Sequence, residues 1–402
     1  MDYNTMKCPL TLNTTRICGE NSIDISIEIS KISFNHMKPN AVILVNKNEV
    51  FDGIAASPLV HLPIDAPILL IDRNMVDDKT LMEIKRLDPK GYKGVQIFLV
   101  GNISNNVGRQ LNPLGLKTYY VTGGNRYETA CRVLKERSKF KNVIIMSGED
   151  YSEGIVASYY SAHHGDPILF VKKDNIPICT LATLKKLHDI NVYILGSTRT
   201  VSKAVEETIR DLNNIKHVKR IQGDSPYSIS VNFAKYKDDK TEFGWGRDYV
   251  EGHAFTFGTL NHPMNIIPGV VFAHMGKHTP LLLIKDHCVP QVVEKYIESV
   301  KPIPPKDMPR PPFMHGFIIG AVEDITYEAQ IKVEQTLSID EHMMMYMKDM
   351  NHMMNHKHHH KEQHMMGMEG MHMMNCEDMK HMHHMMNMEE MDPMNFDYDI
   401  FF

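Results

Sequence analysis

The sequence has no apolar run long enough to cross a membrane, because its apolar stretches are only as long as single buried strands. Residues 1–15 also lack the charged start and the apolar core of a secretory signal peptide. From these two absences we expect no membrane span and no export by the signal-peptide route.

Cysteine is scarce and scattered along the chain. The 402 residues hold six cysteines, with no Cys-x-x-Cys pair and no short regular spacing. We therefore predict reduced, mostly buried thiols. The six are Cys8, Cys18, Cys131, Cys179, Cys288 and Cys376.

Clustered positive charge is also missing. From residue 340 onward there are twelve acidic residues against four Lys and Arg, which leaves 40 Lys and Arg against 37 Asp and Glu before it. This small basic surplus suits a modest anionic partner, but it falls far short of the basic clusters of a nucleic-acid-binding protein. We expect no nucleic-acid partner.

The usual catalytic signatures are absent as well, since the chain has no P-loop, no G-x-G-x-x-G after a strand and no G-x-S-x-G elbow. His163–Asp166 is the one compact cluster before the tail that suits metal binding or acid-base catalysis. A helix is expected to end there, and histidine near the negative end of a helix is the commoner explanation. We predict no catalytic residue and no required cofactor.

The sequence does contain an internal repeat, in which the same motifs follow one another in the same order three times. Each copy has an opening phrase, an acid-led helix start, a Pro-led strand, an amphipathic helix and a strand that ends in glycine. The opening phrases are 16–21, 121–130 and 220–224; the helix starts are 52–56, 153–157 and 251–254; the Pro-led strands are 67–70, 167–170 and 280–283; the Gly-ended strands are 97–101, 192–196 and 317–320.

Alternation of continuous apolar strands with helices indicates parallel sheets covered on both faces. We predict an α/β fold of three tandem parallel-sheet modules in a pseudo-threefold arrangement, covering residues 1–119, 120–218 and 219–338, and a disordered tail over 339–402. The third module has an extra stretch at 262–278 and a proline-rich run at 302–312, which we interpret as an extended surface segment.

The phrase Gly124–Ala130, with the acid-led helix, the Pro-led strand and the Gly-ended strand, resembles the cell wall binding repeat, type two, of Gram-positive surface proteins. The resemblance covers about 16–337 and implies a compact, three-lobed unit that holds an anionic cell-wall polymer. The guanidinium groups can contact such a ligand, or they can tie helix to sheet. The predicted ligand-binding residues are Arg16, Arg126, Tyr127, Arg220, Asp52, Glu153 and Glu251.

The tail is rich in methionine and histidine, with twenty of the thirty Met and eleven of the 23 His lying between residues 342 and 394. Thioether and imidazole ligands suit copper, with nickel or zinc at the His-rich parts, so we predict metal binding there. The alternatives are a low-complexity extension or a sink for oxidants. The predicted ligands are His352, Met353, Met354, His356, His358, His359, His360, His364, His372, His381, His383 and His384.

Together these features favour a non-enzymatic binding protein of the cell envelope or spore coat, with an anionic cell-wall or spore-surface polymer and metal ions as partners. A cytoplasmic metal-buffering protein that uses the modules as a scaffold is the alternative. An unrecognised α/β enzyme is the second alternative.

Overall fold

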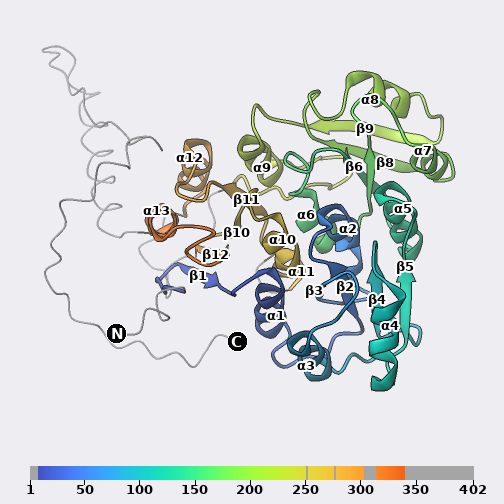
Figure 1. Cartoon of the computed structure of the whole chain (residues 1–402). Helices are drawn as coiled ribbons and strands as arrows, with labels where there is room; N and C mark the ends of the chain where they lie inside the picture. Colours follow the sequence, from blue (N-terminus) through green and yellow to red (C-terminus); the bar gives the residue numbers. More distant parts are fainter. Residues whose placement is uncertain (1–7, 250–251, 276–277, 303–313, 340–402) are drawn as a thin grey trace, which may run out of the picture.

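The computed structural model describes residues 8–249, 252–275, 278–302 and 314–339. Within them the chain forms three four-stranded sheets, and every strand pair is parallel. Figure 1 shows the three sheets as separate lobes around a common centre. The predicted fold class is confirmed. The Met/His tail beyond Ile339, residues 303–312 of the proline-rich run and Glu251 lie outside the described residues.

The first sheet has the order β3-β2-β4-β5. Three of its four strands are wholly buried runs of Ile, Leu, Val and Phe, apart from Asn46 at the end of one of them, as expected for strands that are covered on both faces. The strands are β2 (Val42–Asn46), β3 (Ile68–Ile71), β4 (Ile97–Val100) and β5 (Thr118–Val121), and the helices of this lobe are α1 (Ser22–Ser33), α2 (Val50–Ala56), η2 (Ser57–Val60), α3 (Asp78–Leu87), α4 (Asn105–Leu111) and η3 (Asn112–Leu114).

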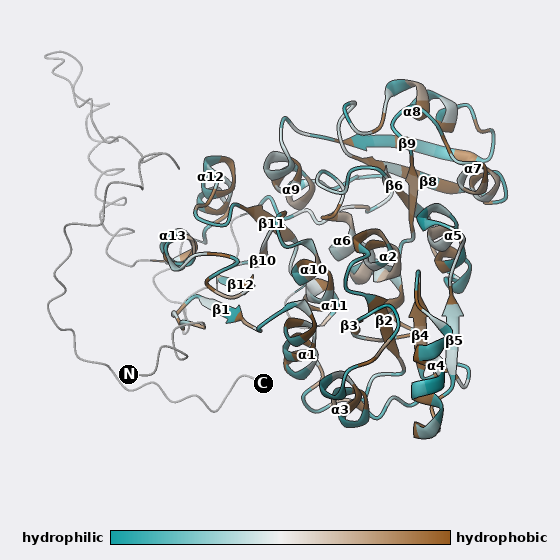
Figure 2. Cartoon of the chain, viewed as in Figure 1, coloured by the Kyte–Doolittle hydropathy of each residue, from teal (hydrophilic) through white to brown (hydrophobic). Residues whose placement is uncertain are grey.

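The second sheet repeats this plan in the order β7-β6-β8-β9. Figure 2 shows its inner strands as hydrophobic and the outer strand β9 as hydrophilic. The strands are β6 (Asn142–Ser147), β7 (Ile168–Val171), β8 (Ile190–Leu195) and β9 (Ile215–Ile221), and the helices are α5 (Arg126–Glu136), α6 (Ala157–His164), α7 (Ile178–Leu184) and α8 (Lys203–Arg210).

The third sheet has the order β11-β10-β12-β1 and differs from the sequence-based prediction. The predicted helix start at 251–254 is wrong in its described part, because residues 252–253 are not helical and Ala254–Thr259 is the central strand β10. The predicted extra stretch at 262–278 includes the central helices of this module. The strands are β1 (Thr14–Ile17), β10, β11 (Leu281–Ile284) and β12 (His315–Ile319), and the helices are α9 (Pro226–Lys235), α10 (Pro263–Ile266), η4 (Ile267–Val270), α11 (Val271–His274), α12 (Gln291–Ser299) and α13 (Tyr327–Leu337).

The modules exchange strands. The strand that opens the second copy, β5, completes the first sheet, and β9, which opens the third copy, completes the second. The opening strand of the first copy, β1, pairs with β12 and so completes the third sheet. Each pairing joins sequence-neighbouring copies except the last, which joins the two ends of the body and closes the three modules into a ring.

Each opening strand is followed by a helix that begins in the same way. Asn21, Asn125 and Ser225 cap α1, α5 and α9 by accepting hydrogen bonds from backbone N–H groups of the first turn. Two residues before each cap is a glycine, and a Cβ at Gly123 would lie 2.4 Å from the backbone N of Thr129. The shared Gly-x-cap spacing therefore sets the tight entry into all three helices.

The central helices of the three modules pack against one another. Figure 1 shows α2, α6 and α10 gathered between the sheets, and α6 packs against both η2 and α11. The Tyr159 hydroxyl on α6 donates to the Ile266 carbonyl at 3.0 Å, although the ring is fully buried. Gly53 on α2 leaves room for Ile267, since an added Cβ would lie 2.8 Å from that side chain. The core of the body is therefore continuous across the modules.

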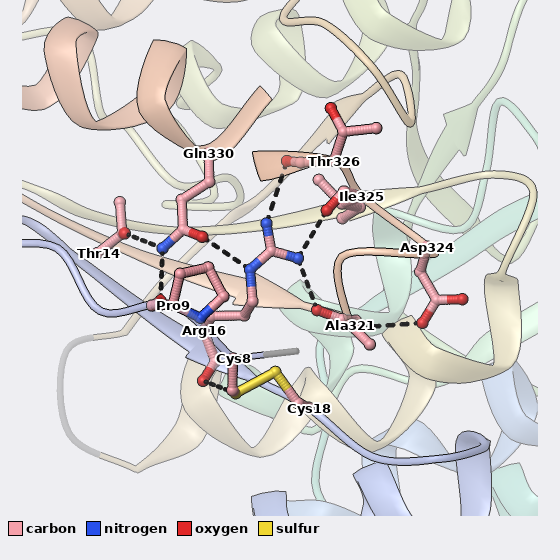
Figure 3. The surroundings of a disulfide bond; sticks show 11 residues. Cys8, Pro9, Thr14, Arg16, Cys18, Ala321, Asp324, Ile325, Thr326 and Gln330 are labelled. Atoms are coloured by element: carbon pink, nitrogen blue, oxygen red, sulfur yellow. Dashed lines mark hydrogen bonds between the residues drawn. A yellow bond between two sulfur atoms is a disulfide. The ribbon is translucent and has the colours of Figure 1, made fainter. Parts of the chain in front are cut away.

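The prediction of reduced thiols is wrong for Cys8 and Cys18, which form a disulfide (Figure 3). The chain folds back before β1, so their Cα atoms lie 5.8 Å apart, within the range that a disulfide spans. Cys288 is also disulfide-bonded. Cys131 and Cys179 are free thiols, as predicted. The error arose because a ten-residue separation shows nothing of this fold-back.

Candidate functional site

Arg16 and Arg220 occupy equivalent positions, one residue before the end of β1 and of β9. Each donates from Nη1 to the carbonyl of the glycine that ends the neighbouring strand, at 2.9 Å to Gly320 and 2.9 Å to Gly196. Figure 3 shows the Arg16 guanidinium surrounded by acceptors, which include Gln330. Burial lowers the pKa of Arg16 to about 10. Both side chains therefore fasten an exchanged strand to its host sheet.

Arg126 is not the counterpart of these two residues, because it lies in the first turn of α5. Its Nη1 donates to the Gly148 carbonyl at 2.8 Å, and its guanidinium lies 4.0 Å from the centre of the Phe51 ring on α2. Tyr127 packs on Gly148, where an added Cβ would lie 2.5 Å from the tyrosine ring. The Arg-Tyr phrase thus connects the first module to the second.

Asp52 and Glu153 are also equivalent, each lying six residues after the last residue of its central strand. Asp52 accepts from the Asn102 N–H at 3.0 Å, and Glu153 accepts from the Ser197 N–H at 2.6 Å. Both carboxylates are buried and hold the turn after a Gly-ended strand.

Their protonation behaviour differs. Burial raises the pKa of Asp52 to about 6, although the hydrogen bond from Asn102 opposes this. Burial also acts to raise the pKa of Glu153, but bonds from Ser197, Thr200 and Arg199 outweigh it and hold that pKa below its usual value. Glu153 is therefore the better stabilised carboxylate.

In the third module other residues hold the turn after the Gly-ended strand. Six residues after β10 is Asn265, whose side chain donates to Asp324 at 3.0 Å, and Asp324 accepts from the Ala321 N–H after β12. Glu251 precedes β10 in the sequence and lies outside the described residues. The regular offset from the central strand would have identified Asn265, had β10 been recognised.

A histidine cluster lies where the three modules meet, and only its His163 and His164 were singled out from the sequence. Each module contributes histidine at or near the end of its central helical segment: His61 after η2, His163 and His164 on α6, and His274 with His278 at α11. Ring centres lie 4.9 Å apart for His61 and His274, and 4.7 Å apart for His163 and His278. We define these five residues as the histidine junction.

Burial, with the neighbouring cationic groups second, lowers the pKa of His163 to about 3 and that of His274 to about 4. The His163 ring stacks on Trp245, with centres 5.1 Å apart, and its Nδ1 is buried without a hydrogen-bond partner. Within the part of the chain that the structure describes, no three His, Cys, Asp or Glu side chains are placed to hold a metal ion. At pH 7 His163 and His274 are therefore neutral rings packed within the junction.

Comparison with known proteins relates the second module to a known family. Residues 121–206 match the model of the cell wall binding domain 2 family. The chain is 26% identical over 223 residues to the N-acetylmuramoyl-L-alanine amidase LytC of Bacillus subtilis, covering 55% of this chain and 42% of that protein. It is 27% identical over 244 residues to the amidase enhancer of the same species, covering 59% and 32%.

Two solved structures share the fold. Cwp6 from Clostridium difficile gives a TM-score of 0.67 at 19% identity, over 83% of this chain and 48% of that chain. Cwp8 from the same organism gives 0.65 at 21% identity, over 81% and 52%. The chain thus spans less than half of the curated relatives above and about half of these two structures. In the described residues, no helix is long and apolar enough to span a membrane.

Proposed function

Because residues 121–206 belong to the cell wall binding domain 2 family, we propose that the three modules together attach the protein to a bacterial cell wall through an anionic wall polymer. The observation that carries this proposal is the threefold repetition of the matched module, closed into one body by the pairing of β1 with β12. A ring of three similar modules offers several contacts to a repeating polymer, and such contacts strengthen one another.

The test is co-sedimentation of the purified full-length protein with isolated Gram-positive cell walls. One sample of walls keeps its covalently bound anionic polymers, and a matched sample has them removed with hydrofluoric acid. We expect binding to the first sample, at least tenfold weaker binding to the second, and weaker binding to both at high salt because the attraction is electrostatic. Equal binding to both samples would exclude an anionic polymer as the ligand.

We further propose that the modules are not catalytic and that the protein acts at the cell surface or in a spore coat. The two curated relatives are named for an amidase and for its enhancement, but this chain spans less than half of either. In this chain residues 121–206 match a binding domain. A fluorescent fusion followed through growth and sporulation tests the location, and a diffuse cytoplasmic signal throughout would favour the metal-buffering alternative.

Metal binding by the tail remains a second proposal, since its ligands lie outside the described residues. It is supported by the joint enrichment of Met and His, a ligand mixture that suits copper. We expect the full chain to bind several copper ions, and a variant with all eleven tail histidines replaced by Gln to lose much of its affinity for Cu²⁺ and Ni²⁺. Unchanged affinity in that variant would remove the proposal.

A further inference from the structure

A groove runs along the outer surface of the second module between α5 and α7. It has a volume of about 420 Å³. A second hollow of about 330 Å³ adjoins it at β5, and Arg132 and Lys135 line both. Figure 1 shows α5 between β5 and α7, so the two hollows form one strip across the exchanged strand. The floor of the groove includes Cys131, Leu134, Cys179 and Leu187.

The rim of this groove carries three exposed cations, Arg132, Lys135 and Lys186. In the described part of the chain, none of their side chains forms an ion pair or a hydrogen bond. Arg132 and Lys135 are three residues apart on α5 and therefore project from one face of the helix. The groove thus presents positive charge that the fold itself does not use.

The two acids beside these cations are already engaged elsewhere. Glu128 accepts from the Gly124 N–H at 2.9 Å and from the Asn125 side chain at 3.1 Å, which ties it to the start of α5. Glu136 accepts from the Tyr119 hydroxyl at 3.1 Å. Both carboxylates keep their charge, but among the described residues neither forms an ion pair with Arg132, Lys135 or Lys186. Three cations therefore line the strip against two carboxylates, which leaves a surplus of positive charge for an anion from outside.

We propose that this groove is a binding site for an anionic glycopolymer, with Arg132, Lys135 and Lys186 contacting its negative groups. The apolar floor suits the non-polar faces of sugar rings, and Tyr119, which is 43% exposed, extends that surface at β5. This inference rests on the proposed function and adds to it the place of binding, which none of the residues predicted from the sequence occupies.

The equivalent surfaces of the other modules lack this arrangement. In the first module Lys79 pairs with Asp24 across α1 and α3. In the third module the equivalent surface lies between α9 and α12, where Lys235 pairs with Asp248 and its Nζ lies 5.4 Å from the centre of the Tyr296 ring. Those cations are partly neutralised by the fold. The second module is also the one that the family model matches, so we assign the main polymer contact to it.

The test compares two full-length variants with the same change in net charge. The groove variant is Arg132→Glu, Lys135→Glu and Lys186→Glu. The control variant is Lys85→Glu, Lys203→Glu and Lys295→Glu, which reverses one exposed cation in each module outside the groove. All six side chains are exposed, so we expect both variants to fold, as circular dichroism would verify. A neutral version of the groove variant, with Gln at the same three positions, repeats the test without reversed charge.

We expect the groove variant to bind polymer-containing walls at least tenfold more weakly than wild type, the neutral version several-fold more weakly, and the control variant within twofold of wild type. If wild type binds walls and the groove variant binds equally well, the groove is not the site, while the proposed function stands. If wild type does not bind walls, the proposed function and this inference both fail.

A second readout reports on the groove directly. Cys179 is a partly exposed free thiol on the floor, so a polymer in the groove should slow its alkylation by iodoacetamide, measured by mass spectrometry of the Cys179 peptide. We expect protection by soluble polyglycerolphosphate teichoic acid and none by neutral dextran of similar length. If Cys179 is already protected in the free protein and becomes reactive only in the groove variant, the chain's own acidic tail is the occupant and the inference is wrong.

Discussion

Acidification should loosen the joint between the three modules, because folding buries imidazoles that are charged at low pH. The pKa of His163 lies near 3 and those of His164 and His274 near 4, well below the usual value of 6.5, with burial as the first cause. The pKa of His61 is lowered as well.

The surroundings offer these imidazoles little compensating charge. The buried Arg137 guanidinium donates to the His61 carbonyl. The Asp65 carboxylate lies 3.8 Å from His274 Nε2, which is a long separation for an ion pair. Arg247 and Lys237 also act to lower the imidazole pKa values. The nearby carboxyl of Asp166 has the opposite effect on the pH dependence of stability, since burial raises its pKa to about 7.

The sign and size follow from linkage. The unfolded chain binds protons at these histidines near pH 6.5, whereas the folded chain does not, so stability is greatest above pH 6.5 and falls as the pH drops toward 4. One pKa unit corresponds to about 1.4 kcal/mol. His163 and His274 are partly exposed, so after allowance for solvent screening we expect them to contribute together a loss of roughly 2–4 kcal/mol over this interval. Protonation of Asp52 and Asp166 works in the opposite direction.

The variant His163→Phe measures how much one of these histidines contributes to the pH dependence of stability. It keeps a ring against Trp245 and breaks no hydrogen bond at Nδ1, which has no partner. We expect equal or higher stability at pH 7.5 and a stability advantage that grows by about 1–2 kcal/mol between pH 7 and pH 4.5. Urea unfolding at each pH, followed by the fluorescence of Trp245, the single tryptophan of the chain, measures it. Parallel stability curves for the two proteins would refute the reasoning.

Three further predictions concern the contacts that hold the ring together. Glu153→Gln removes the charge that accepts bonds from Ser197, Thr200 and Arg199, and should lower the free energy of unfolding by about 2–3 kcal/mol in urea at pH 7; a loss below 0.5 kcal/mol would contradict the role assigned to it. Arg16→Lys should increase amide hydrogen exchange in β1 and β12 more than in β6, because one ammonium cannot replace a guanidinium that bonds Gln330, Gly320 and Ile325; uniform exchange would argue against a local fastening role. Cys8→Ser removes the disulfide that closes a loop of ten residues, and should lower the free energy of unfolding by about 2–3 kcal/mol relative to wild type under non-reducing conditions. Equal stability of the variant and the oxidised wild type would show that the disulfide does not stabilise the fold.

The order of the elements could be predicted from the sequence because their signals are local. The buried strands are continuous runs such as Ile97–Val100, and Pro67 and Pro167 mark where two others begin. The helix from Asp78 to Leu87 shows its apolar face in the spacing of its leucines and isoleucine. Repetition of these signals three times fixed the α/β class and the number of modules, since a local pattern that recurs must fold in a similar way each time.

The site residues were harder, because what a charged side chain does depends on neighbours that are distant in the sequence. For Arg16 the sequence left two roles open, contact with a ligand and tying helix to sheet, and the partners that use its donors, Gln330 and Gly320, lie more than 300 residues away. Asn265 was overlooked because β10 was taken for a helix start. The unpaired cations of the groove have no sequence signature at all, since only the packing of α5 beside α7 shows that Arg132 and Lys186 share a rim.

The sequence by itself thus determined the strands, the helices and their threefold repetition, since hydrophobic period and turn residues act over a few positions. Only the tertiary structure decided that each opening strand joins the preceding sheet, that β1 returns to β12 and that five histidines meet at the centre. The physical reason is that ring closure and the meeting of helix ends depend on the relative placement of all three modules, a property that no single segment encodes.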